Sequence, residues 1–189
     1  MDTNNKIMNL ILFVILPLWG ISGFLDWICH KKTNIEKTSG LKESLIHALM
    51  GIQIGIPIVL GIFFDFTVLT FLIMLVFLVL HEIVAHWDVS YAKEKREISI
   101  WEVHVHNYLA TVPFYILALV SVLGWEVVKN TFLLKWKGDF YLGFRDTPIG
   151  GSSYYLIFGI FMAVVCVFPY ISEILRCWRY ERKLKANGN

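Results

Sequence analysis

The chain has few charged residues and few cysteines, and both shortages restrict what it can be. Only 17% of its 189 residues are charged, whereas 57% are hydrophobic and gather in long runs. This composition excludes an ordinary soluble domain and indicates an integral membrane protein, with no nucleic acid among its partners. The three cysteines, Cys29, Cys166 and Cys177, form no spaced motif. They therefore indicate neither a disulfide framework nor a zinc ribbon.

Signatures of common redox cofactors are also absent from the sequence. It contains no flavin or nicotinamide fingerprint and no set of iron-sulfur cysteines. It also has no low-complexity tract and no second domain, so we expect residues 1–189 to form a single transmembrane domain. If the chain performs oxidation chemistry, it needs a separate electron-donor protein.

Five apolar stretches are long enough to cross a bilayer as helices, which takes about 20 residues each. They cover residues 7–25, 44–64, 67–86, 106–125 and 154–175. We therefore predict an all-α protein with five transmembrane helices. Residues 126–153 are expected to form one sizeable external loop, with a short amphipathic segment around 132–141.

The positive charges predict how the chain is oriented. Twelve of the seventeen Lys and Arg residues follow the first, third and fifth spans. Because positively charged flanks tend to remain in the cytoplasm, the N-terminus is expected outside and the C-terminus in the cytoplasm.

The six histidines lie beside carboxylates at the ends of the apolar stretches, and four of them repeat one spacing. The pairs are Asp26/His30, Glu43/His47, Glu82/His86 and Glu102/His106, each an acid followed four positions later by a histidine. On a helix, this spacing places both side chains on one face. In the predicted topology all four pairs lie toward the cytoplasm, and the opposite membrane face has no histidine.

We interpret these pairs as metal ligands from four helices that form a bundle around a cytoplasm-facing site. Ionisable groups in a span are costly unless they are paired, hydrated or bound. For any single pair, a position among wet lipid headgroups is an adequate explanation. The concentration of every histidine in one layer favours a shared site, similar in logic to the dimetal sites of soluble bundles.

Four further residues belong to this layer. His81 lies seven residues before Asp88 on one helical face and is a candidate ligand, and His104 precedes His106 by two residues. Asp88 and His104 are candidates either for ligation or for orienting a ligand. Arg96 is either a neutraliser of carboxylate charge or an ordinary cytoplasmic cation.

The donor set indicates two transition-metal ions. Mixed nitrogen and oxygen donors suit iron, zinc or manganese, whereas magnesium and calcium take fewer imidazoles. Six histidines with nearby acids also exceed the three protein ligands of a catalytic zinc. The types of donor alone do not decide between a di-iron site and a di-zinc site.

Two of these motifs resemble those of the membrane-bound histidine-box oxygenases, which include acyl desaturases and lipid hydroxylases. They are HEIVAH, with His81, Glu82 and His86, and EVHVH, with His104 and His106. The chain differs from those families in lacking an adjacent His-His pair. The resemblance implies two iron ions and O2-dependent hydroxylation or desaturation of a lipid or other hydrophobic substrate.

Two other functions remain open at this stage. A zinc site could activate water for hydrolysis of a lipid ester, amide or phosphate, with Glu82 or Asp88 as the catalytic base. Paired acids and histidines could also carry protons or metal ions across the membrane. Transport is less well supported, because the ionisable groups occupy only one side of the predicted spans.

Overall fold

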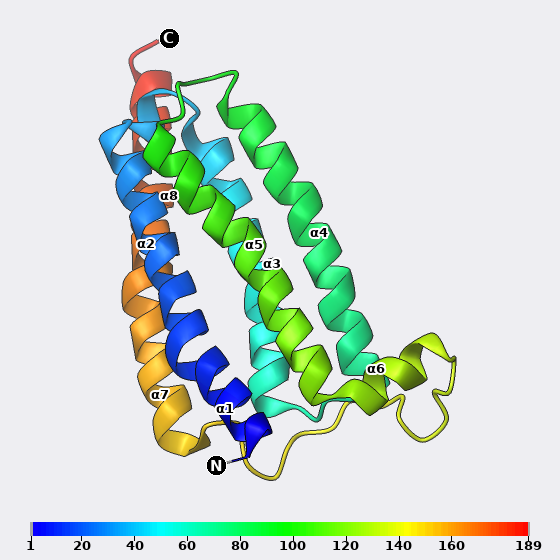
Figure 1. Ribbon diagram of the computed structural model, residues 1–189. Coiled ribbons are helices and arrows are strands. Elements are labelled where there is room, and N and C mark those ends of the chain that lie inside the picture. Colours follow the sequence, from blue (N-terminus) through cyan, green and yellow to red (C-terminus); the bar gives the residue numbers. More distant parts are fainter. Residues whose placement is uncertain (1, 189) are drawn as a thin grey trace.

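The computed structural model describes residues 2–188, and it is almost entirely helical (Figure 1). The α-helices are α1 (Thr3–Leu10), α2 (Leu16–Lys32), α3 (Gly40–Phe63), α4 (Val68–Ala92), α5 (Ile100–Leu123), α6 (Trp125–Phe132), α7 (Gly151–Met162) and α8 (Phe168–Ala186). Short turns of tighter or wider helix are η1 (Ile11–Ile15), η2 (Ile35–Lys37) and η3 (Ala163–Val167). Within residues 2–188 the only strand-like pairing is an isolated antiparallel bridge between Phe64 and Phe144.

Five continuous helical segments are long and apolar enough to cross a membrane, which confirms the number predicted from the sequence. They are Thr3–Lys32, Gly40–Phe63, Val68–Lys93, Ile100–Leu123 and Gly151–Ala186. Most of these helices continue beyond the apolar stretches. The acid/histidine pairs at the ends of those stretches are therefore helical, and the helix fixes the direction in which each side chain projects.

Two of the segments change their hydrogen-bond pattern just before a proline. η1 and η3 are π-helical and lead directly into the first turns of α2 and α8, where Pro17 and Pro169 lie. Proline has no backbone N–H to donate to the preceding turn, so a wider turn at that point is expected. Each segment nevertheless remains one continuous helical rod.

The external loop differs from the prediction. The short amphipathic helix is α6, which ends at Phe132, and residues 133–148 form turns and extended chain. The expected segment at 132–141 is therefore wrong. The backbone there contains Leu134 and Gly138 at positive φ values of 56° and 87°, which are incompatible with a right-handed helix.

The two ends of the molecule, at the bottom and top of Figure 1, differ in the side chains that are buried there. At the end with the N-terminus and α6, a hydrophobic core of the first helix, α3 and α7 includes Leu12, Leu16, Ile62 and Phe158. At the other end lie the connections between α2 and α3 and between α4 and α5, together with the C-terminal part of α8. The buried polar side chains concentrate there.

Candidate metal centre

Five carboxylates are buried at the end of the molecule that contains these connections. They are Asp26 (1% exposed), Glu43 (0%), Asp88 (0%), Glu102 (1%) and Glu173 (0%). They come from all five long helical segments. His30, His47 and His106 lie among them, and Arg96 is the cation that contacts them directly.

The imidazoles of His30 and His47 stack on each other between α2 and α3. Their ring centroids are 4.4 Å apart, and the ring planes differ by only 8°. Glu173 of α8 lies beside both rings, with Oε2 3.2 Å from His30 Nδ1 and Oε1 3.7 Å from His47 Nδ1. The Ser44 hydroxyl donates a 3.0 Å hydrogen bond to Oε1 of the same carboxylate. Glu173 therefore lies on the Nδ1 side of both histidines, with a hydrogen bond to His30 and a longer contact to His47.

The opposite nitrogens of these rings face the remaining acids. His30 Nε2 lies 3.5 Å from both Asp26 Oδ2 and Glu102 Oε1. His47 Nε2 lies 3.1 Å from Asp88 and 4.0 Å from Glu43 Oε1. A carboxylate on one ring nitrogen leaves the other nitrogen available as a ligand, which is the arrangement common at metal sites.

His106 of α5 joins two acids from different helices. Its Nδ1 lies 3.0 Å from Asp26 Oδ1, and its Nε2 lies 3.1 Å from Asp88 Oδ2. The Tyr170 hydroxyl of α8 is 3.3 Å from Asp26 Oδ2 and 3.2 Å from the carbonyl oxygen of Gly23. Asp26 is thus held on two sides, by α5 and by α8.

Arg96, in the connection between α4 and α5, bridges two of the carboxylates. Its Nη2 donates to Glu43 Oε1 at 2.5 Å and also to Glu102 Oε1, and its Nη1 donates to Glu102 Oε2 at 2.9 Å. Burial alone would lower the pKa of Arg96, but the hydrogen bonds and charges of Glu102 and Glu43 raise it above its usual value. Its position accords with neutralisation of carboxylate charge, one of the two roles considered from the sequence.

Seven side chains of this cluster are arranged so that they could hold metal ions. Three groups have one ligand atom per residue within 4.8 Å of one another: Asp26, His30 and His47; His47, Asp88 and His106; and His30, Glu43 and Glu102. These side chains come from α2, α3, α4 and α5. Because the groups share His30 and His47, they form one continuous set of donors.

Four of the predicted site residues lie outside these groups. His86 and His104 are exposed, Glu82 is half-buried, and His81 is buried about two turns deeper in α4 than Asp88. Helix geometry explains this placement. His86 lies about 200° around α4 from Asp88 and Glu82 about 120°, whereas His81 shares the face of Asp88 but is displaced by about 10 Å along the axis. His104 is likewise turned away from His106.

The structure also adds residues that were not selected from the sequence. Glu173, Tyr170 and Ser44 contact the cluster directly. Glu173 is the only Asp, Glu, Lys or Arg in the apolar stretch 154–175. Since an isolated acid within a span is expected to be functional or paired, this was a usable signal. Glu173 has no histidine four residues later, so the acid/histidine spacing does not select it.

Comparison of the chain with protein-family models, with curated proteins and with solved structures finds no match in any of the three.

Proposed function

We propose that this protein is a membrane metalloenzyme whose buried cluster binds two divalent transition-metal ions. The observation that carries the proposal is the charge of the cluster. Five buried carboxylates and one guanidinium leave four negative charges when the three histidines are neutral. Two divalent cations would neutralise them, whereas protonation of all three histidines would still leave one negative charge. Uncompensated charge is very costly in a buried environment.

The donor types favour transition metals. Imidazole nitrogens suit iron, zinc and manganese, and carboxylate oxygens add hard donors that tolerate a rise in metal charge. The proposed ligands are the seven residues Asp26, His30, Glu43, His47, Asp88, Glu102 and His106. Glu173 and Arg96 instead hold ligands in place. His81, Glu82, His86 and His104 have no part in this site.

We infer O2-dependent oxidation of a hydrophobic substrate as the reaction. Two iron ions would supply the activation of dioxygen. In the balanced hydroxylation, R–H, O2, two electrons and two protons yield R–OH and water, and the electrons come from a separate donor protein. The chain itself limits the access of water: Asp26, His30, Glu43, Asp88 and Glu102 are at most 1% exposed, whereas the His106 side chain is 21% exposed. Exclusion of bulk water suits oxidation better than hydrolysis.

The proposed location is the cytoplasmic side of the membrane. The connections at the cluster's end of the molecule and the C-terminal part of α8 carry most of the lysines and arginines. By the positive-inside tendency this end faces the cytoplasm, where an electron donor is available.

Metal analysis of the purified protein tests the proposal. We expect about two metal ions per chain, with iron and an O2-sensitive absorption supporting oxidation. Zinc, with hydrolytic activity in the absence of O2, would contradict it. His30→Ala should lose most of the bound metal. His86→Ala and His104→Ala remove exposed histidines from the same end and serve as matched controls. Equal metal loss in all three variants, or no bound metal in the wild type, would refute the site.

A further inference from the structure

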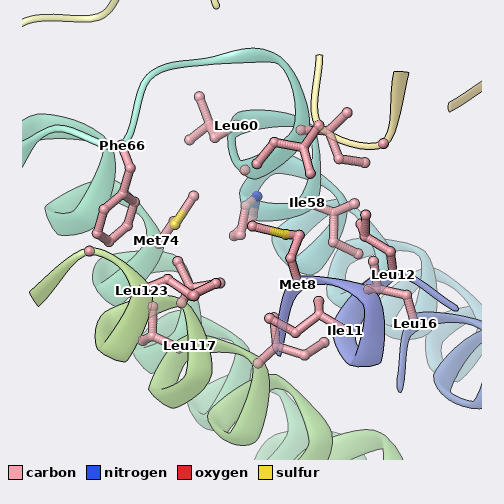
Figure 2. A pocket seen from close by; sticks show the side chains of 18 of the residues that line it. Met8, Ile11, Leu12, Leu16, Ile58, Leu60, Phe66, Met74, Leu117 and Leu123 are labelled. Carbon is pink, nitrogen blue, oxygen red and sulfur yellow. The ribbon is translucent and has the colours of Figure 1, made fainter. Parts of the chain in front are cut away.

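A second feature lies at the opposite end of the molecule from the metal centre. It is a cavity of about 710 Å³ between the first helical segment, α3, α4 and α5. Its walls are mainly apolar, and Figure 2 shows Met8, Met74 and Leu117 directed toward a common space from three different segments. The volume lies within the range of about 300 to 1,000 Å³ found for small-molecule sites.

The cavity is elongated along the helices. On α3 its lining extends from Phe64, which follows the last turn, to Ile54, a separation of about 15 Å along the helix. Beyond Ile54, His47 lies seven residues further, or about 10 Å. The deepest lining residues on other helices, Leu78 and Pro113, also point to the middle of the span. The inner end is therefore directed toward the metal centre but stops short of it.

The outer end of the cavity is polar. On the first helical segment, Asn5 and Asn9 lie on the same face as Leu12 and Leu16, and all four line the cavity. This face is consequently polar at the membrane surface and apolar further in. Such a gradient matches an amphiphile, which has one polar head and one apolar tail.

Arg145 provides a positive charge at this polar end. Its Nε donates a 2.5 Å hydrogen bond to the Phe64 carbonyl oxygen, and its backbone N–H donates to the Phe63 carbonyl oxygen at 2.9 Å. Burial lowers the pKa of Arg145, and nearby Asp65 partly opposes this. Within residues 2–188 no carboxylate forms an ion pair with the guanidinium. Its remaining N–H groups suit a carboxylate, which they can bind in bidentate fashion.

We propose that this cavity binds a single-chain amphiphile with a carboxylate head, with the head at Arg145 and the chain between α3, α4 and α5. Binding requires no metal ion. A further consequence rests on the proposed oxidation: the part of the ligand nearest the metal centre is the end of the chain farthest from the carboxylate.

Direct binding of a long-chain fatty acid tests this site. We would measure saturable binding of radiolabelled stearate to the purified full-length protein in nanodiscs, with stearyl alcohol as the uncharged comparison. Gly61→Leu should abolish binding of both probes. Gly61 lines the cavity, and a Cβ there would lie 3.7 Å from Met74 Cε, an ordinary van der Waals contact, so that the rest of the leucine side chain would occupy the cavity. Gly51→Leu is the matched control on α3, since Gly51 is exposed and a Cβ there would meet nothing within 4 Å.

Arg145→Gln tests the head group. It should weaken stearate binding about tenfold, the effect of losing about 1.4 kcal/mol, and leave stearyl alcohol binding unchanged. Stearate binding that survives Gly61→Leu would overturn the proposal, as would equal effects of Arg145→Gln on both probes. Metal content measured on the same samples separates the two proposals. Absence of metal with normal stearate binding refutes the metal centre alone, and normal metal content without stearate binding refutes the cavity site alone.

Discussion

Arg96 is the residue whose replacement should reduce the stability of the protein most, because its guanidinium lies between two buried carboxylates. Glu43 and Glu102 are both at most 1% exposed, and Arg96 donates hydrogen bonds to each. Without it, two like charges would face each other away from water. Removing one partner of a buried ion pair lowers the stability of a protein far more than removing one partner of an exposed pair.

Arg96→Gln should therefore destabilise the protein by about 3 to 5 kcal/mol. Arg96→Lys should recover only part of this loss, because a lysine lacks the planar fork that contacts both acids. The thermal unfolding midpoint of the purified protein measures the effect. Lys95→Gln, a change at the exposed neighbouring cation, is the control. A similar loss in both glutamine variants would show that the bridging position has no special role.

Glu173 has a different role, since it contacts the Nδ1 side of two proposed ligands. Glu173→Gln keeps the size of the side chain but removes its negative charge and one acceptor. We expect metal affinity to fall about 10- to 100-fold. The visible spectrum of the cobalt-substituted protein should also shift, because His30 and His47 are no longer held in one orientation. Ser44→Ala should give a smaller shift of the same kind.

Glu181→Gln on the same helix is the control for Glu173, because Glu181 is exposed and pairs with the exposed Lys185. Unchanged affinity and spectrum in Glu173→Gln would mean that this carboxylate does not orient the histidines.

At the scale of a helix, the burial pattern of α4 decides which of its polar residues reach the cluster. Its buried positions include Phe71, Met74, Leu78, His81 and Asp88, which follow one face of the helix. Glu82 and His86 lie off this face although they carry the same four-residue spacing as the other pairs. Spacing alone therefore does not identify which residues join the buried cluster, and the apolar face of the same helix is the better guide.

Asp88 and Glu82 lie on the same helix, but only Asp88 faces the cluster. Asp88→Asn should reduce the bound metal to half or less, because Asp88 contacts both His47 and His106. Glu82→Gln should leave the metal content unchanged. Both substitutions replace a carboxylate by an amide on one helix, so metal analysis compares them directly. A loss confined to Glu82→Gln would restore the ligand assignment made from the sequence.

The sequence predicted the five long helices because long apolar runs and their polar interruptions can be recognised locally. The pairs Asp26/His30, Glu43/His47 and Glu102/His106 do lie in the buried cluster. The contributions of Glu173 and Tyr170 depend on how α8 packs against α2 and α3, and no local pattern specifies that packing. For α4, the sequence spacing does not specify how the helix is rotated about its axis, and this rotation decides which of its polar side chains face the cluster.

For the whole molecule, metal binding and stability should be coupled. If both ions bind only the folded protein, each contributes about 2.7 kcal/mol when free metal is 100 times its dissociation constant. The two ions together contribute about 5 kcal/mol, so removal by a chelator should lower the unfolding midpoint by roughly 10 to 20 °C. Restored metal should reverse the change. The Glu43→Gln variant lacks a proposed ligand and should bind less metal, so its midpoint should respond much less to the chelator. An unchanged wild-type midpoint would contradict a structural contribution from bound ions.

Glu173 lies in the last long helix, whereas the histidines it contacts lie in the first two. During biosynthesis the N-terminal helices leave the ribosome well before residue 173 is translated, because synthesis adds only about 5 to 20 residues per second. The nascent chain therefore carries an incomplete set of buried acids until its final segment inserts. If the cluster binds metal as proposed, the site is completed only when the last segment inserts. A chain truncated before α8 should then be degraded by quality control.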